Sequence, residues 1–396
     1  MRKKDVMIIG AGKIGRGYLS DLFSECGFHL VLVNNRTETI DALNKAGSYT
    51  IFISEKSGLR KKIISGYEAY AVSRDFDQIT ERLTQIDLAC IALYPSAYES
   101  VAKVIAAAVI KRKELALDEP LNFCMFVNYV GSGKLMKESV LSLLDESQKD
   151  YFKNHIGIVE ALTWRGGIQP TEEMLAEDPL CVSTNEGKVM PVGDEFVGGR
   201  PTEVPYFEFI DKAEGRLVLK VWCGNMRHCT IANIGQHRGY TFTYECARDP
   251  YIRHVCDMAS NEALTAVQKE FDFTDEDIAA SNKNNWEDMA SGKDHDYVTR
   301  VAADPLRKLS RNERYIGPAL LCLKNDILPY YLAKGAAYEL LFHNDKDVTA
   351  NKMHQMISDL GIEEALWQFT GLNKDVRDEY FLYQLILKSY KDICNS

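Results

Sequence analysis

The amino-acid sequence predicts an α/β protein in which an N-terminal doubly wound sheet is followed by a mostly α-helical C-terminal domain. In the N-terminal half, short β-branched runs alternate with longer helical patterns, as successive strand–helix units of a parallel sheet do. Beyond residue 210 the pattern turns almost wholly helical. The chain has 396 residues, which exceeds the usual size of one hydrophobic core. Two domains are therefore expected.

Five buried strands and two hairpins are expected in the N-terminal domain. The strands are predicted at residues 5–10, 29–33, 87–93, 122–127 and 157–161, and the hairpins at 50–72 and 180–196. Gly and Pro concentrate in VGGRPTEVP, residues 197–205, which predicts a boundary there. The expected domains are residues 1–205 and 206–396, and the second is helical in pattern, for example through residues 316–340 and 375–393.

Composition and charge argue against several classes of protein. The chain is 46% hydrophobic and 26% charged, which provides for a packed core. Its net charge of −10 argues against a nucleic-acid partner, and no stretch approaches the ~20 apolar residues needed to span a membrane. The ten cysteines form no CxxC pair or zinc-finger cluster, as expected for reduced thiols of a cytoplasmic protein without a metal site. We expect a small-molecule partner, and the oligomeric state, monomer or homo-oligomer, stays open.

The first candidate site is a glycine loop near the N-terminus. The strand predicted at 5–10 leads directly into G-A-G-K-I-G, and an amphipathic helix is expected from about Arg16. A GxGxxG motif between a strand and a helix is typical of a Rossmann-type dinucleotide-binding domain, although a tight turn without a ligand is the alternative. In such a domain the first glycine permits the turn, the second lets the backbone approach a pyrophosphate, and the third lets helix and strand pack closely. The predicted cofactor-binding residues of this loop are Gly10, Gly12, Lys13, Ile14 and Gly15.

The end of the second predicted strand bears on the choice between NAD and NADP. It reads V-N-N-R, residues 33–36, where an NAD enzyme usually places an acid to hold the ribose hydroxyls. Asn34 cannot repel a 2′-phosphate and Arg36 can pair with one, which is compatible with NADP. In the alternative interpretation, Asn34 hydrogen-bonds the ribose of NAD and Arg36 lies in solvent. Both cofactors stay open.

The second candidate site is the segment LKVWCGNMRHCT, residues 219–230. It is otherwise apolar or small, yet it carries Lys220, Asn225 and His228. If the segment is α-helical, these three residues fall within about 140° of arc and share one face. A lysine whose pKa is lowered in a partly dry pocket can act as general base toward an alcohol, and amide and imidazole groups can steady the developing alkoxide. Surface residues beside a core histidine give the same pattern, so this segment alone does not distinguish an active site from an ordinary helix.

Several longer stretches extend this interpretation over most of the chain. They are GAGKIGRG (10–17), IDALNKAGSYT (40–50), VNYVGSGKL (127–135), HRGYTFTYECARDPYIR (237–253) and DPLRKLSRNERYIGPALL (304–321). Together with Lys-x4-Asn-x2-His after the glycine-loop domain, and in this order, they resemble the polyol-specific long-chain dehydrogenases. More narrowly, they resemble the branch of that family that acts on sugar phosphates, to which the chain is also close in length.

The resemblance implies a zinc-independent hydride transfer between a carbohydrate and a nicotinamide cofactor. It implies Lys220 as general acid/base, Asn128 and Asn225 as residues that polarise the reacting oxygen, and His228 as a residue that orients the substrate. Asn128 also follows a predicted strand end, where ligands gather in open α/β sheets. The expected substrates are a sugar phosphate like fructose 6-phosphate and an alditol phosphate like mannitol 1-phosphate. The alternatives are a free polyol, a hexuronate held by Arg227 or Arg307, and a dinucleotide-binding sensor without turnover.

Two arginines are expected to contact the substrate. Arg307 belongs to the basic segment DPLRKLSRNER, and its guanidinium suits a phosphate or a carboxylate. The other cations of this segment, Lys308, Arg311 and Arg314, are expected to raise the local potential, although such a cluster is usually a solvated helix face. Arg165 is the second candidate.

Two departures from the family pattern are expected to alter the substrate side of the site. Arg165 lies in T-W-R-G-G-I, residues 163–168, where relatives usually have V-D-R-I with an acid that contacts the substrate. Met226 and Arg227 stand where a small Thr-Gly pair is expected. These departures leave the hydride chemistry credible and put the identity of the substrate in doubt.

Overall fold

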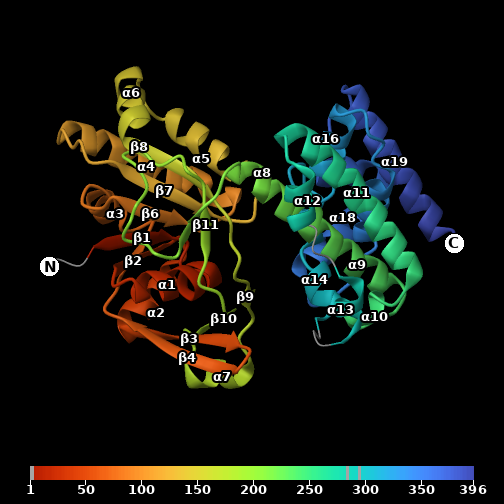
Figure 1. Cartoon of the computed structure of the whole chain (residues 1–396), viewed down its shortest axis with the longest axis horizontal. Helices are drawn as coiled ribbons and strands as arrows, with labels where there is room; N and C mark the ends of the chain where they lie inside the picture. Colours follow the sequence, from red (N-terminus) through yellow and green to blue (C-terminus); the bar gives the residue numbers. More distant parts are fainter. Residues whose placement is uncertain (1–3, 282–284, 293–295) are drawn as a thin grey trace. The chain divides into compact units, whose positions relative to one another are not determined.

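The computed structural model describes residues 4–281, 285–292 and 296–396. The chain divides into two compact units, Met1–Glu214 and Gly215–Ser396 (Figure 1). The division falls later than the boundary expected at 205, because the strand β12 (Phe207–Phe209) still pairs within the sheet of the N-terminal unit.

The N-terminal unit is built on an eight-stranded sheet in the order β12-β11-β8-β7-β6-β1-β2-β5. Its other strands are β1 (Asp5–Ile9), β2 (His29–Asn34), β5 (Glu68–Ala71), β6 (Leu88–Ile91), β7 (Leu121–Phe126), β8 (Ile156–Ala161) and β11 (Met190–Val192). The strands from β5 to β8 pair in parallel, whereas β11 is antiparallel to β8. Numbered along the chain, the parallel part has the order 3-2-1-4-5-6, so the chain reverses its direction of winding between β1 and β6.

Helices cover both faces of this sheet, as predicted for a doubly wound fold. Alternate residues of β1 point to opposite faces, Val6 and Ile8 to one and Met7 and Ile9 to the other. On the first face lie the π-helical turn η1 (Ile14–Leu19) and the helices α1 (Ser20–Glu25) and α2 (Thr37–Ala46). The second face is covered by α3 (Phe76–Leu83), α4 (Tyr98–Glu114), α5 (Ser132–Leu141) and α6 (Glu146–His155), with the short turn η2 (Pro95–Ala97) before α4. The five predicted strands of this sheet are confirmed.

A second, four-stranded sheet has the order β4-β3-β10-β9. Its strands are β3 (Ser48–Glu55), β4 (Gly58–Ser65), β9 (Gly167–Ile168) and β10 (Val182–Asn185), and the helix α7 (Glu172–Glu177) lies between the last two. The hairpin predicted at 50–72 is confirmed for β3 and β4 only, because residues 68–71 form β5 of the main sheet. The hairpin predicted at 180–196 is wrong, since β10 pairs with β3 in one sheet and β11 pairs with β8 in the other.

The C-terminal unit is helical in its described residues. It starts within α8 (Ala213–Val218), which continues into the π-helical turn η3 (Leu219–Asn225) and α9 (Met226–His237). The following helices are α10 (Thr243–Cys246), α11 (Pro250–Phe271), α12 (Asp275–Ser281), α13 (Trp286–Ala290), α14 (Val298–Ala302), α15 (Pro305–Lys308), α16 (Ile316–Lys324), α17 (Tyr330–Leu340), α18 (Val348–Thr370) and α19 (Arg377–Cys394).

The helical pattern predicted at 375–393 is confirmed as α19, and the one predicted at 316–340 is confirmed as α16 and α17, with a break between Lys324 and Tyr330. The chain leaves the helix after Lys324, because Asp326 takes a left-handed conformation with φ of 58° and Pro329 precedes the next helix. The helical range therefore consists of two helices, α16 and α17.

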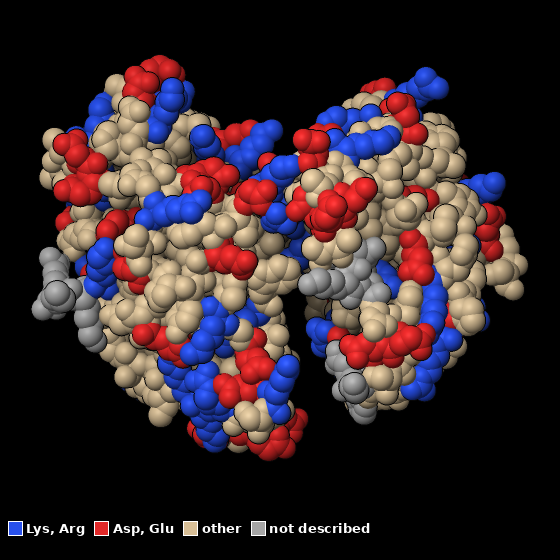
Figure 2. All heavy atoms as spheres, in the orientation of Figure 1, with Lys and Arg blue, Asp and Glu red and all other residues tan. Residues whose placement is uncertain are grey.

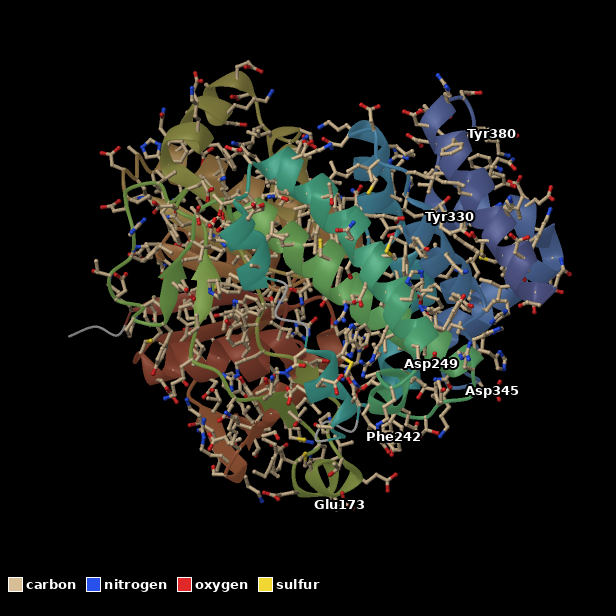
Figure 3. All side chains as sticks on the ribbon, turned by 45° about the vertical axis from the view of Figure 1, so that its right-hand side comes forward. Glu173, Phe242, Asp249, Tyr330, Asp345 and Tyr380 are labelled. Carbon is tan, nitrogen blue, oxygen red and sulfur yellow. The ribbon has the colours of Figure 1, made fainter. Side chains whose placement is uncertain are left out.

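The stretch 237–253, which contributed to the resemblance, closes the turn between α9 and α11. Asp249 caps α11 by accepting the Tyr251 N–H at 2.8 Å, and it also pairs with Arg238 at 2.8 Å and accepts the Tyr240 hydroxyl at 3.1 Å (Figure 3). The motif thus has a structural role in the C-terminal unit.

Basic and acidic side chains are interspersed over the face of each unit that Figure 2 shows. Among the described residues, no helix combines the length and the apolar character that crossing a membrane requires.

Candidate active site

The glycine loop lies at the switch point of the main sheet, where β1 and β6 end side by side. Gly10 has φ of 109°, and a Cβ there would lie 2.5 Å from the Ala92 carbonyl oxygen at the end of β6. A Cβ at Gly15 would lie 2.1 Å from the Gly10 oxygen, whereas a Cβ at Gly12 would meet no heavy atom of the described chain within 4 Å. Two glycines are therefore required by packing, and the middle one leaves its backbone open to a ligand. This geometry fits a dinucleotide pyrophosphate.

The helix after the loop begins earlier than expected, as the π-helical turn η1 instead of a regular helix from Arg16. Arg16 fixes this turn, because its guanidinium donates to the Ala11 carbonyl at 2.9 Å and to the Leu180 carbonyl at 2.6 Å. Lys13 donates from Nζ to the Gln169 side chain at 2.6 Å, and burial lowers its pKa. The second sheet thus holds the glycine loop, a role that the sequence did not reveal because Leu180 and Gln169 lie far along the chain.

The residues predicted to hold the adenosine ribose lie at the carboxyl end of β2. Asn34 is half-buried and its Oδ1 accepts the Arg36 N–H at 3.3 Å, while the Arg36 side chain is exposed. Beside them lies a cavity of about 460 Å³, lined by Val72, Ser73, Phe76, Ser96, Glu99, Ser100 and Lys103. Asn35 donates to Ser100 across this region at 3.4 Å. The cavity lies where the ribose and adenine of a dinucleotide bind in such sheets, and it was missed because the pairing of β5 with β2 was not anticipated.

Asn128 lies two residues after β7, on the connection to α5 and at the same carboxyl edge of the sheet as the glycine loop. Its side chain is half-buried. The expectation that it follows a strand end, where ligands gather, is confirmed.

In the C-terminal unit, the segment 219–225 is π-helical and not α-helical as assumed. Hydrogen bonds in a π-helix join residues five apart, so Lys220 and Asn225 stand one turn apart. Single π-helical turns are rare and occur frequently at functional sites. Lys220, Asn225 and His228 are half-buried, whereas their chain neighbours Met226 and Cys229 are buried. The three polar residues thus share a face, through a geometry that the sequence pattern did not indicate.

The environment of this face changes the chemistry of its lysine. Burial lowers the pKa of Lys220 to about 7, so the amine exchanges its proton near neutral pH. Nε2 of His228 lies 3.7 Å from Asp296, a carboxylate that also pairs with Arg300. Trp222 supports the turn, donating from Nε1 to the Asn312 carbonyl at 3.1 Å.

Arg227 and Met226, which were expected to alter the substrate side, point into the interior of the C-terminal unit. Arg227 is 4% exposed, its guanidinium lies 3.9 Å from the centre of the Trp286 ring, and it contacts Asp257 at 3.3 Å. Met226 is fully buried. The expectation that Arg227 holds a carboxylate substrate is therefore wrong.

The basic segment 304–314 is neither a solvated face nor an unbalanced positive region. Arg307 is held by Asp304 and by Glu313, whose Oε1 accepts from Nη1 at 2.7 Å. Arg311 pairs with Glu379 at 2.6 Å. Lys308 donates to the Val301 carbonyl at 2.6 Å and lies 3.9 Å from Glu339, and Arg314 donates to the Cys229 sulfur at 2.6 Å. The charges of this segment are thus largely matched by carboxylates inside the unit.

Arg165 is 3% exposed and belongs to the interior of the N-terminal unit. Its guanidinium donates to Asp21 at 2.7 Å and to the Asn185 carbonyl at 2.7 Å, and it stacks over Tyr18. The expectation that Arg165 contacts the substrate is wrong, because both the burial and the ion pair place it in the packing of α1 against the second sheet.

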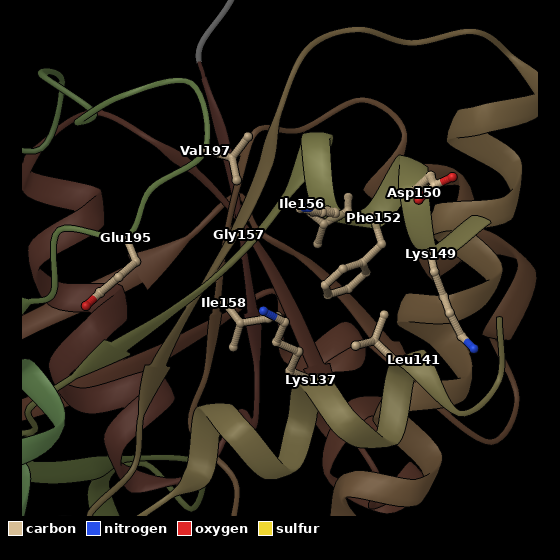
Figure 4. A pocket seen from close by; sticks show the side chains of 11 residues that line it. Lys137, Leu141, Lys149, Asp150, Phe152, Ile156, Gly157, Ile158, Glu195 and Val197 are labelled. Carbon is tan, nitrogen blue, oxygen red and sulfur yellow. The ribbon is translucent and has the colours of Figure 1, made fainter. Parts of the chain in front are cut away.

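A further cavity, of about 440 Å³, lies at the amino end of β8, beside Ile156 and Gly157 (Figure 4). Phe152 and Leu141 point into it, while Lys149 points away. Since the glycine loop lies at the carboxyl edge of the sheet, this cavity is not part of the dinucleotide site. Within the described ranges, no group of three or more His, Cys, Asp or Glu side chains is arranged to hold a metal ion.

A glycine loop at the switch point of a 3-2-1-4-5-6 sheet is typical of a dinucleotide-binding domain. A lysine of lowered pKa in the helical unit is a candidate for proton transfer, as an oxidoreductase of alcohols requires. Comparison with known families agrees. The family models described as the mannitol dehydrogenase Rossmann domain and the mannitol dehydrogenase C-terminal domain match residues 4–202 and 217–394. The chain belongs to the mannitol dehydrogenase family, and it is an NAD(P)-dependent polyol dehydrogenase, an oxidoreductase.

Solved structures with low sequence identity share the fold. Mannitol 2-dehydrogenase of Pseudomonas fluorescens, in a ternary complex with NAD and D-mannitol, matches with a TM-score of 0.78 and 15% identity, over 99% of this chain and 92% of that one. A substrate-free D-sorbitol dehydrogenase matches with a TM-score of 0.68 and 12% identity, over 99% and 93%. The 2-dehydropantoate 2-reductase of Geobacter metallireducens matches less well, with a TM-score of 0.55 and 11% identity, over 85% and 98%.

Proposed function

We propose that the protein interconverts a polyol and the corresponding keto-sugar, with Lys220 as the general acid/base and without a metal ion. The observation that carries the proposal is the π-helical turn η3 with the start of α9, which together place a lysine of pKa about 7, Asn225 and His228 on one face. A general acid/base is most effective when its pKa lies near the operating pH.

The chemistry divides between the cofactor and the protein. The nicotinamide ring, when bound, accepts hydride from the carbinol carbon in oxidation and returns it in reduction. The neutral amine of Lys220 takes the hydroxyl proton of the polyol, and its ammonium form supplies that proton in the reverse direction. The amide groups of Asn225 and Asn128 donate to the reacting oxygen, and His228 holds a neighbouring hydroxyl.

Gly10, Gly12, Lys13, Ile14 and Gly15 hold the cofactor pyrophosphate in this proposal, and Asn34 and Arg36 hold the adenosine ribose. The open backbone at Gly12 and the cavity beside Asn35 support these roles. The similar structure of mannitol 2-dehydrogenase contains NAD, and the exposed guanidinium of Arg36 also suits the 2′-phosphate of NADP.

The leading substrate pair is a sugar phosphate and its alditol phosphate, such as fructose 6-phosphate and mannitol 1-phosphate. Its support is the resemblance of the whole chain to mannitol-1-phosphate 5-dehydrogenase. A free polyol is the second candidate, since Arg307, the proposed phosphate contact, is already held by Asp304 and Glu313. A hexuronate substrate is less well supported, because Arg227, one of the two arginines proposed to bind its carboxylate, is buried against Trp286.

A panel of keto-sugars distinguishes these candidates. Reductase activity with NADH and NADPH is measured on fructose 6-phosphate, fructose and a hexuronate, and cofactor binding is followed by quenching of tryptophan fluorescence. We expect the highest kcat/KM for fructose 6-phosphate, and Arg307→Ala should raise its KM while leaving the KM for fructose unchanged. Equal effects on both sugars would assign Arg307 to structure and favour the free polyol. Cofactor binding without turnover on any member of the panel would contradict catalysis and support a sensor.

A further inference from the structure

A half-buried carboxylate, that of Glu160 on β8, reaches the start of α5 from the neighbouring strand. Its Oε1 accepts the Gly133 N–H at 2.7 Å, and its Oε2 accepts the Ser132 hydroxyl at 3.0 Å. A Cβ added at Gly133 would lie 2.6 Å from Oε1, so only glycine lets the carboxylate approach so closely. This contact joins segments 27 residues apart in the chain.

The helix α5 depends on this contact, because its own N-terminus has no side-chain cap. The N-cap residue is Gly131, with φ of 77°, and it has no side-chain oxygen to accept the first N–H groups of the helix. Unsatisfied N–H groups at a helix start are costly when buried, and a negative charge there is favoured by the helix dipole. Glu160 therefore supplies from β8 the cap that the local sequence lacks.

The fixed helix start borders the connection that carries Asn128. β7 ends at Phe126 and α5 starts at Ser132, so the five residues 127–131 are anchored by the sheet at one end and by Glu160 at the other. Because Met125 of β7 pairs with Glu160 of β8, the carboxylate stands level with the last residues of β7. Burial raises the pKa of Glu160 to about 7, partly offset by the two hydrogen bonds it accepts from α5.

We propose that Glu160 is a positioning residue, which sets the conformation of the 127–131 connection and so aims the amide of Asn128 at the reacting oxygen. This inference rests on the proposed function, in which Asn128 polarises that oxygen. Glu160 itself touches neither substrate nor cofactor in the proposal. A small displacement of such a hydrogen-bond donor lowers the reaction rate, since a displacement of about 1 Å can lower the rate 10²-fold.

The test is a double-mutant cycle on the full-length enzyme, measured at saturating keto-sugar and cofactor. We expect Glu160→Ala to lower kcat roughly 10- to 100-fold with the cofactor KM unchanged. Glu160→Gln should remain close to wild type, because its amide can still accept from Gly133 and contact Ser132. In an Asn128→Ala background, Glu160→Ala should cost little further, because the residue it aims is gone. Glu138→Ala, which removes an exposed carboxylate of α5 itself, is the matched control and should change nothing.

Gly133→Ala provides a second route, since its methyl group displaces the Glu160 carboxylate without removing it, and it serves if Glu160→Ala fails to fold. It should reproduce the loss in kcat and the non-additivity with Asn128→Ala. An equal loss of kcat in both backgrounds would overturn the proposal, because Glu160 would then act on the enzyme by another route. If Asn128→Ala alone keeps the wild-type kcat, both this proposal and the role of Asn128 in the proposed function are overturned. If Asn128→Ala has a low kcat but Glu160→Ala keeps the wild-type kcat, only the positioning role of Glu160 is overturned.

Discussion

Lys220 and Lys308 are two lysines of the C-terminal unit that are withdrawn from water in different ways. Lys308 is 2% exposed, its Nζ donates to the Val301 carbonyl, and Glu339 lies 3.9 Å away as a counter-charge. Lys220 is half-buried in a π-helical turn, and desolvation lowers its pKa to about 7. A lysine beside a buried carboxylate is part of the packing, whereas one with a pKa near neutrality can exchange a proton at the pH of the cell.

The contrast extends to the segments around these lysines. The 304–314 segment is dense in charge, yet its cations are bound to carboxylates such as Glu313 and Glu379. The 219–228 segment has fewer charges but presents three polar groups on one face. A high density of charged residues in a sequence therefore predicts an active site poorly. Partial burial of a polar residue, or an irregular helix at that residue, predicts one better.

The largest effect is expected from Lys220→Ala. Loss of a positioned general acid/base should lower kcat by ~10² to 10⁴-fold, while the protein still folds and binds dinucleotide. Steady-state kinetics on the best keto-sugar measure the loss, and small primary amines should restore part of it. Lys324→Ala, which removes an exposed lysine of α16 paired with Glu270, is the control and should retain full activity.

The two buried lysines should also respond oppositely to replacement by methionine. Lys308→Met removes one of the cations beside the buried Glu339 and the donor to the Val301 carbonyl, so the free energy of unfolding should fall by about 3–5 kcal/mol. Lys220→Met removes an ammonium group that the folded state disfavours, so stability should rise at pH 7 and below. Because the folded pKa is below the unfolded one, this gain should shrink as the pH rises from about 7 toward the ordinary value of 10.5. Urea unfolding at several pH values measures both; a loss of stability in Lys220→Met at pH 6 would make Lys220 a packing residue like Lys308.

A smaller effect concerns the cofactor in the N-terminal unit. Arg36→Ala should raise the KM for NADPH by roughly 10- to 100-fold and leave that for NADH nearly unchanged, because only NADPH carries the phosphate that a guanidinium binds. Arg74→Ala is the matched control, since Arg74 is already paired with Asp41 at 2.7 Å and with Asp75 at 3.0 Å. Equal changes for both cofactors would exclude Arg36 from the recognition of the 2′-phosphate.

The sequence predicted the main sheet well because its signals are local. The strand-loop-helix pattern around Gly10, Gly12 and Gly15 and the apolar runs of β1, β2 and β7 are determined by neighbours in the chain. The second sheet was misread because its pairings are not local, as when β10 joins β3 more than a hundred residues away. Likewise, the break between α16 and α17 depends on the left-handed backbone conformation of Asp326, which the spacing of hydrophobic residues does not predict.

Within the candidate site, the sequence indicated polar residues but not their environment. Lys220, Asn225 and His228 were found from their spacing, although the spacing was interpreted with the wrong helix geometry. Arg165 was misassigned because its partner, Asp21, lies 144 residues earlier. Glu160 carried no signal at all, since its role depends on a strand and a helix that meet only in the folded unit.

The most direct test of the central claim is the pH dependence of kcat/KM for polyol oxidation in the wild-type enzyme and in Lys220→Met. The neutral amine is the reactive form in oxidation, so the wild-type value should rise as the pH increases through about 7 and then level off, and the reverse reaction should fall over the same range. Lys220→Met should retain only slow turnover without this rise. Because the pKa of Glu160 is also raised to about 7, the Glu160→Gln enzyme is measured alongside and should keep the wild-type profile. A rise centred near pH 7 that persists in Lys220→Met would contradict the assignment of Lys220 as the proton-transfer residue.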